Sequence, residues 1–241
     1  MHARTRGETG QGARIAAILE AFDRPGELLG PSELARRTGL AKSTAHRLAH
    51  ELADAGLLER VAGQMRPGAL MLEFGRRMAP RELRDAAGPL MGDLREAIRL
   101  GVLLAVLDGQ DVVCADSLPA AGAPATPRPG DRRPALTTAS GRAILAFSPR
   151  ELSTGAIDAG VTAGVPRALL TQRLTGIRKS GISVERRERG LGTVACPILD
   201  EDGHALAALA VPYRGGGETA DRITAALRTA ALTLSRLLRT H

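Results

Sequence analysis

The chain has 241 residues, enough for one large domain or two ordinary ones. Apolar residues make up 44% of the chain but aromatic residues only 2%, and tryptophan is absent, so the core must consist of aliphatic side chains. Scarce aromatic residues argue against recognition of unpaired bases by stacking. The net charge of +7, from 33 basic and 26 acidic residues, favours an anionic partner such as nucleic acid.

Membrane insertion and secretion are not expected. The longest apolar runs, residues 101–107 and 205–211, are far shorter than the roughly 20 residues of a membrane-spanning helix. Residues 1–10 are polar and predict a disordered leader instead of a signal peptide. The two cysteines, Cys114 and Cys196, are far apart, which fits a reducing cytoplasm and argues against a structural zinc site. We therefore expect a cytoplasmic protein without metal or cofactor.

The first 56 residues predict three helices. Ile15, Ile18, Leu19 and Phe22 have the spacing of one apolar helix face, and this first helix should end before residues 24–26. A second helix should occupy residues 31–38, between a capping glycine and Gly39. After a short turn, the spacing predicts a third helix at residues 42–55.

The third helix has one apolar face and one basic, polar face. Residues 34–50 contain four basic side chains, two histidines and no acid, although residues 1–75 as a whole carry a net charge of only +1. Ser43, His46, Arg47 and His50 share the outward face. A solvated helix face is the ordinary alternative, but a carboxylate-free face also suits the major groove of DNA, where Arg47 could reach guanine and Lys42 a phosphate.

A β-hairpin should follow, with strands at residues 57–61 and 65–68 joined by a tight turn at 62–64. Two helices, a turn, a polar helix and a hairpin are the order of a winged helix-turn-helix domain. Arg60, Gln64 and Arg66 would then contact an adjacent backbone or minor groove from the wing.

The remainder predicts an α+β domain with an antiparallel sheet. Charged residues and Pro80 indicate a linker helix at residues 76–87, and further helices are expected at 88–100, 139–147 and 166–179. Two hairpins are expected, one pairing residues 102–107 with 111–115 and one pairing 193–199 with 205–211. A final amphipathic helix, capped by Thr219, should pack on the sheet or on a second subunit.

The sequence SELARRTGLAKSTAHRL at residues 32–48, followed by ELADAGLLER at 51–60, resembles the DNA-binding domain of IclR-type bacterial transcriptional regulators. Four further segments, residues 130–134, 138–146, 177–182 and 190–203, resemble parts of the same family's effector domain. The resemblance implies a winged helix-turn-helix domain (11–75), a linker helix (76–87) and a GAF-like effector-binding and oligomerisation domain (88–241). It also implies a homodimer or homotetramer that binds double-stranded DNA and a small-molecule effector, and that is not an enzyme.

Two sets of site residues follow. The candidate DNA contacts are Ser32, Arg36, Lys42, Ser43, Thr44, His46, Arg47, His50, Arg60, Gln64 and Arg66. The candidate effector contacts, carried over from the resemblance, are Gly130, Arg132, Thr138, Ala139, Ser140, Gly141, Glu185, Cys196 and Ala210. Residues 209–212 lack the serines common in relatives that bind small carboxylic acids, so a more apolar effector or an unused pocket is open, while Arg132, Arg133 and Arg142 keep a small organic acid open.

Several single residues have more than one interpretation. Cys196 could line the pocket or only pack in the core, and Cys114 is expected to be core. Ser140 precedes a glycine but lacks the glycine two residues before it that a hydrolase nucleophile elbow requires. A hydrolase using Ser140 or Cys196 and a protein-binding scaffold therefore remain the rivals to a regulator. Activation or repression is open, as is the regulated process, which could be catabolism or, as in some actinobacterial relatives, development or secondary metabolism.

Overall fold

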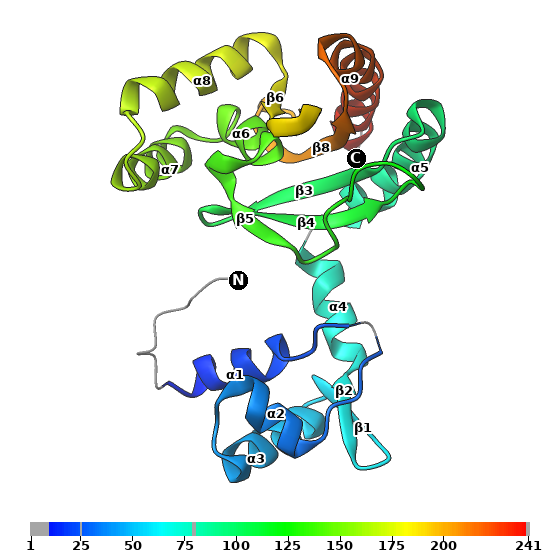
Figure 1. The fold of residues 1–241 in the computed structure, drawn as a ribbon, viewed down its shortest axis with the longest axis vertical. Helices are drawn as coiled ribbons and strands as arrows, with labels where there is room; N and C mark the ends of the chain where they lie inside the picture. The colour runs from blue at the N-terminus through cyan, green and yellow to red at the C-terminus, as the bar shows by residue number, and fades with distance from the viewer. Residues whose placement is uncertain (1–9, 25, 79–80, 240–241) are drawn as a thin grey trace. The chain divides into compact units, whose positions relative to one another are not determined.

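A computed structural model describes residues 10–24, 26–78 and 81–239 (Figure 1). The expected disordered leader lies outside the described residues, apart from Gly10. The chain divides into two compact units, Met1–Met78 and Ala79–His241, and each is described by itself. Among the described residues, no helix combines the length and the apolar character needed to cross a membrane.

The N-terminal unit is a small helical domain with a two-stranded wing. Its core consists of aliphatic side chains from all three early helices and both strands, with Ile18, Leu34, Leu48, Leu58 and Met65 all at most 2% exposed. The elements in order are α1 (Gln11–Glu20), α2 (Pro31–Thr38), α3 (Lys42–Asp54), β1 (Leu58–Val61), β2 (Gln64–Pro67) and α4 (Ala69–Met78). The expected winged helix-turn-helix arrangement is confirmed.

The wing owes its register to a two-residue turn. Ala62 and Gly63 both have positive φ, 49° and 79°, and Val61 pairs with Gln64 across the turn. This backbone matches the twist of a hairpin. Met65 exchanges two backbone hydrogen bonds of 2.9 Å with Leu29, which ties the wing to the segment before α2.

The C-terminal unit is built on a six-stranded antiparallel sheet with strand order β5-β4-β3-β8-β7-β6. Its strands are β3 (Val102–Asp108), β4 (Asp111–Leu118), β5 (Arg132–Pro134), β6 (Ser183–Arg186), β7 (Leu191–Leu199) and β8 (Ala205–Arg214). Its helices are α5 (Arg81–Ile98), α6 (Ala139–Ala146), α7 (Arg150–Thr162), α8 (Arg167–Ser180) and α9 (Gly217–Arg239), with 3-10 turns at Ala135–Thr137 and Glu188–Gly190. The α+β class and both predicted hairpins are confirmed.

Each face of this sheet packs against its own set of helices. Helices α5 and α9 cover one face, and α6, α7 and α8 belong to the core on the other (Figure 1). Side chains alternate along a strand, so Val194 and Cys196 belong to the α5/α9 core while Ala195 belongs to the α6 core. Both cores rely on aliphatic residues, as the composition requires.

Some elements differ from the sequence expectation. The expected linker at residues 76–87 is divided between the end of α4 and the start of α5, because Leu83 and Ala87 are buried in the core of the C-terminal unit. Residues 79–80 of that linker lie outside the described residues. Thr219 is not a cap, since α9 already begins at Gly217. Helix α9 packs on the sheet through Ile223 and Leu227. The helix α7 and the edge strands β5 and β6 were not expected.

A pair of glycine substitutions tests the close packing of α6. A Cβ at Gly141 would lie 2.3 Å from the carbonyl oxygen of Ala135, whereas one at Gly155, within α7, would meet nothing within 4 Å. Gly141→Ala should lower the free energy of unfolding of the C-terminal unit by about 1–3 kcal/mol through overpacking. Gly155→Ala should raise it by about 0.5–1 kcal/mol. Urea denaturation of both variants measures this, and equal effects would contradict the packing described.

Candidate functional site

The exposed face of α3 gathers the predicted DNA-contacting side chains of this helix. A left-handed residue, Gly39 at φ 70°, ends α2 and turns the chain into α3. Buried Ala45, Leu48 and Leu52 anchor the opposite face of α3 in the core. Lys42, Ser43, His46 and Arg47 are consequently exposed, while Thr44 and His50 are half-buried. The first turn of α3 also presents backbone N–H groups that have no intrahelical acceptor.

Several predicted DNA-contacting arginines hold carboxylates within the domain. Arg47 pairs with Glu51 one turn along α3, and Arg36 binds Glu33 through two hydrogen bonds of 2.6 and 2.8 Å. Both pairs are solvent-exposed, so they add little stability and can exchange partners. Lys42 has no ion-pair partner among the described residues.

The wing is fastened to α3 by Arg60. Its guanidinium donates to Nδ1 of His50 (3.1 Å), to the carbonyl of His50 (3.2 Å) and to Asp54 (2.6 Å). The rings of His46 and His50 lie with centroids 4.3 Å apart. Arg60 therefore positions the wing against the helix, a role that its sequence position did not reveal.

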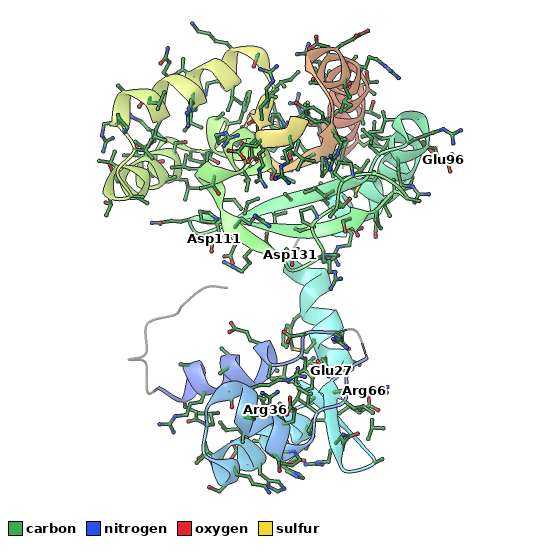
Figure 2. All side chains as sticks on the ribbon, in the orientation of Figure 1. Glu27, Arg36, Arg66, Glu96, Asp111 and Asp131 are labelled. Carbon is green, nitrogen blue, oxygen red and sulfur yellow. The ribbon has the colours of Figure 1, made fainter. Side chains whose placement is uncertain are left out.

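The remaining predicted residues of this unit are also exposed. Arg66 pairs with Glu59 across the wing at 2.8 Å, Gln64 lies at the wing turn, and Ser32 lies in the first turn of α2. Figure 2 labels Arg36 and Arg66 on this unit. The structure thus places all eleven predicted DNA contacts on α2, α3 and the wing, nine of them exposed and two half-buried.

A structural ion network lies behind the predicted contacts. Arg37 donates to the carbonyl of Ala21 (2.8 Å), to Glu27 and to Glu33, and its side chain is only 24% exposed. Hydrogen bonds from Arg36 and Arg37 lower the pKa of Glu33 from 4.5 to about 2. This network joins the end of α1 to α2 and so fixes the position of α1 relative to α2.

The C-terminal unit contains a cavity of about 440 Å³ beneath the start of α6. Apolar side chains from the sheet and from the loop before β5 form most of its wall: Leu103, Ala105, Val112, Pro124, Ala125, Pro127, Leu191 and Pro212. Thr126, Thr193 and Cys114 also line it. Cavities of this size typically hold a small organic molecule.

The N-terminus of α6 faces this cavity. Thr138 caps the helix, its hydroxyl accepting the N–H of Gly141 at 3.0 Å. Ala139 and Ser140, which follow the cap, both line the cavity, and first-turn N–H groups have no intrahelical acceptor. A helix N-terminus in this position favours a negatively charged ligand group.

Charged residues stand at the margins of the cavity. Asp131 and Arg133 come from the β4–β5 side (Figure 2 labels Asp131), and Glu185, Arg187 and Arg214 come from the β6–β8 side. Glu185, only 15% exposed, accepts a 2.6 Å hydrogen bond from Arg187. Arg142 lies behind them, donates to the carbonyl of Leu136, and has its pKa lowered by burial.

The structure brings together only some of the predicted effector contacts. Thr138, Ala139, Ser140 and Glu185 line the cavity. The others do not: Gly141 and Ala210 pack beside it, Gly130 precedes β5, Arg132 turns away to pair with Asp108, and Cys196 is elsewhere.

The placement of Cys196 among the effector contacts needs correction. Strand alternation places Cys196 on the α5/α9 face of the sheet, where burial raises the pKa of its thiol to about 12. Cys114 is a core residue as expected; it also borders the cavity, and burial raises the pKa of its thiol to about 11. The sequence analysis did not name the cavity residues Leu103, Val112 and Thr193. Each lies two positions along its strand from another lining residue, so the alternation of side chains along a strand is a signal in the sequence that could have found them.

One group of metal-ligating side chains forms at the β7–β8 turn. Asp200, Asp202 and His204 each offer a donor atom, all within 4.8 Å of one another. The sequence predicted no metal site. Asp200 is already engaged within the turn, where its carboxylate accepts the N–H of His204 at 2.8 Å.

Comparisons with known proteins agree with this architecture. Residues 13–62 match the family model described as the IclR helix-turn-helix domain, and residues 77–236 match the one described as the bacterial transcriptional regulator IclR C-terminal domain. The chain is 28% identical to the HTH-type transcriptional regulator KipR of Bacillus subtilis, over 85% of this chain and 88% of that protein. It is also 28% identical to the glycerol operon regulatory protein of Streptomyces coelicolor, over 92% and 94%.

Solved structures give the same result. An IclR homologue from Microbacterium hydrocarbonoxydans in complex with 4-hydroxybenzoate is 26% identical, with a TM-score of 0.80 over 96% of this chain and all of that one. The IclR protein of Thermotoga maritima is 25% identical, with a TM-score of 0.71 over 93% and 97%.

The Glu33 network predicts a pH-dependent stability of the N-terminal unit. Because the pKa of Glu33 is about 2 in the fold and ordinarily 4.5, its contribution is complete above pH 4.5 and is lost as the pH falls towards 2. Glu33→Gln should therefore be less stable than the parent at pH 7, and the difference should shrink as the pH is lowered. Denaturant midpoints at several pH values measure it.

Glu51→Gln is the matched control for this prediction. It removes an exposed pair whose partners are 48% and 58% exposed, so stability should change little. A deficit in Glu33→Gln that stays constant from pH 7 to pH 3 would contradict the network.

Proposed function

Because the chain belongs to the IclR family of bacterial transcriptional regulators, we propose that α3 and the wing read an operator in duplex DNA. Proteins of this family bind DNA through the helix-turn-helix and a small effector through the C-terminal domain. The observation that carries the residue-level proposal is the first two turns of α3, which expose Lys42, Ser43, His46 and Arg47 without a carboxylate among them.

The division of labour follows from side-chain chemistry. Arg47 contacts a base edge in the major groove, while Lys42 and the first-turn N–H groups of α3 bind phosphate. Arg60 and Arg66 bring the wing to the neighbouring backbone. Arg47, Arg60 and Arg66 each exchange an internal carboxylate for DNA, which is inexpensive because those pairs are exposed.

The C-terminal cavity binds a small organic acid in this proposal. The effector's carboxylate accepts hydrogen bonds from the first-turn N–H groups of α6 at Ala139 and Ser140. The apolar part of the effector packs on Leu103, Val112 and Pro212. The 4-hydroxybenzoate complex of a structural relative supports an aromatic acid. A cavity of about 440 Å³ favours an occupied pocket over an unused one.

The protein acts in the cytoplasm as a homodimer or homotetramer in this proposal, without catalysing a reaction. A helix-turn-helix dimer reads two half-sites about one helical turn apart, which doubles the contact area. Of the two nucleophiles considered for a hydrolase, Cys196 lies on the sheet face away from the cavity with a raised pKa of about 12. Labelling of Ser140 by an active-site serine probe would contradict this proposal and support the alternative of a hydrolase.

The regulated genes are catabolic in this proposal. The glycerol operon regulatory proteins of Streptomyces coelicolor and Streptomyces griseus, 28% and 27% identical to the chain, support this choice. Genomic footprinting of the bound sites tests it, and sites confined to developmental or secondary-metabolic genes would overturn it.

DNA binding should depend strongly on salt and on Lys42. Gel shifts with a duplex selected from a random library should give a steep negative slope of log K against log salt. Lys42→Ala should weaken all sequences alike and reduce that slope by about 1. Arg47→Ala should cost about 1–3 kcal/mol and relax the preference at one base pair. Lys179→Ala, the same change in α8, is the control; a flat slope would refute DNA binding.

The effector proposal predicts discrimination between acids and their amides. Calorimetry with a panel of carboxylates that includes 4-hydroxybenzoate should find binding that the matched primary amide lacks, because helix N–H groups prefer the anion. Ala125→Trp should fill the cavity and abolish binding, whereas Ala121→Trp, on the same loop but outside the lining, should retain it. Equal binding of acid and amide would contradict the proposed anchor.

A further inference from the structure

A second cavity, of about 820 Å³, lies at the other end of α6. Its wall comes from the end of α6, the helices α7 and α8, and the β7–β8 turn, and it shares no residue with the effector cavity. Helix α6 has only eight residues, about 12 Å in length. The two cavities therefore lie at opposite ends of one short helix.

The second cavity is basic. Arg150, Arg167 and Arg178 line it, against one lining carboxylate, Asp202. Arg167 is paired with Asp158, but Arg150 has no partner among the described residues. Within the described part of the chain, Arg178 donates only through its Nε, so its two terminal nitrogens remain as donors.

The rest of the wall suits a phosphate group carried on an organic body. Three threonine hydroxyls, of Thr154, Thr171 and Thr175, add donors, while Phe147 and Leu174 add apolar surface. Guanidinium groups bind phosphate oxygens in pairs of charge-assisted hydrogen bonds. A cavity of this volume is much larger than a bare phosphate and matches a small metabolite.

Wall residues of the second cavity supply three of the four hydrogen bonds that fix the C-terminal end of α6. Four successive carbonyls, of residues 144–147, accept hydrogen bonds from outside the helix. The donors are Ser148 Oγ to Ile144 (3.0 Å), Ser153 Oγ to Leu145 (2.8 Å), Arg178 Nε to Ala146 (2.5 Å) and Ala205 N to Phe147 (3.0 Å). A ligand that engages Arg178 therefore acts directly on the end of the helix whose other end faces the effector.

We propose that this cavity is a second small-molecule site, which binds a phosphate-bearing metabolite and biases the position of α6. The binding stands on the cavity alone, and the regulatory consequence rests on the proposed function of the effector cavity. By linkage, a ligand that moves α6 changes effector affinity, and the effector changes phosphate affinity by the same factor.

Calorimetry on the full chain in a phosphate-free buffer tests the site. Inorganic phosphate and glucose 6-phosphate are the probes, and glucose is the uncharged match. Both phosphates should bind and glucose should not. Arg150→Gln should weaken binding by about tenfold or more, as expected for a lost charge-assisted contact, and Arg178→Gln should do the same.

Two control variants locate the binding. Arg222→Gln makes the same charge change on α9, and Arg133→Gln makes it at the effector cavity. Both variants should leave the affinity for the two phosphates unchanged. Binding of neither phosphate, equal weakening by Arg222→Gln, or loss of binding in Arg133→Gln alone would each overturn the site. Arg150→Gln keeps the test decisive if Arg178→Gln unfolds α6.

Hydrogen exchange tests the link through α6 without knowledge of the effector. Glucose 6-phosphate should change amide exchange in peptides covering residues 139–147 in the parent and not in Arg150→Gln. Unchanged exchange in the parent would overturn the link while leaving the site standing. Failure of the carboxylate panel would concern only the effector cavity, so the two proposals fail separately.

Discussion

Strand alternation across the central sheet is the constraint on which the C-terminal unit depends. Strands β3, β7 and β8 are buried on both faces, so every residue must suit one of two cores. On the α6 side of β7 and β8, the core residues Ala195, Ala208 and Ala210 are small, and this lets the helix approach closely. The cavity opens where this close packing ends, at the first turn of α6. The cavity is thus a product of the packing and not an addition to it.

Helix α6 lies between the two cavities of the C-terminal unit. Thr138 at its start leaves two N–H groups directed at one cavity, and hydrogen bonds from Ser153 and Arg178 fix its end at the other. A short helix held at both ends moves as one unit. A charge at either terminus, where the helix dipole is concentrated, therefore affects the position of the whole helix.

Local patterns in the sequence predicted the first three helices of the N-terminal unit, its wing, and both long hairpins, but not α4. Hydrophobic periodicity and glycine turns are local signals, so spacing such as that of Ser43, His46 and Arg47 sufficed to place a face. Contacts between separate elements were not predicted in this way: the hydrogen bonds of Arg60 to Asp54 and His50 join residues six and ten positions apart, from the wing and α3. The resemblance left Cys196 open between the pocket and the core because it gave a segment but not the face of the strand. Helix α7, with glycines at 155 and 160, offered only a weak periodic signal.

In the proposed binding of DNA, the internal carboxylate partners of Arg47, Arg60 and Arg66 affect the search for the operator along the genome. A guanidinium that already carries a fixed counterion gains less from a random phosphate than a bare one, so fewer mobile ions are released on non-specific contact. Residence on wrong sites shortens accordingly. Exchange of the carboxylates for phosphates becomes favourable overall only where base contacts form at the same time. These exposed acids therefore lower the affinity for non-specific DNA relative to the operator and favour movement along the duplex.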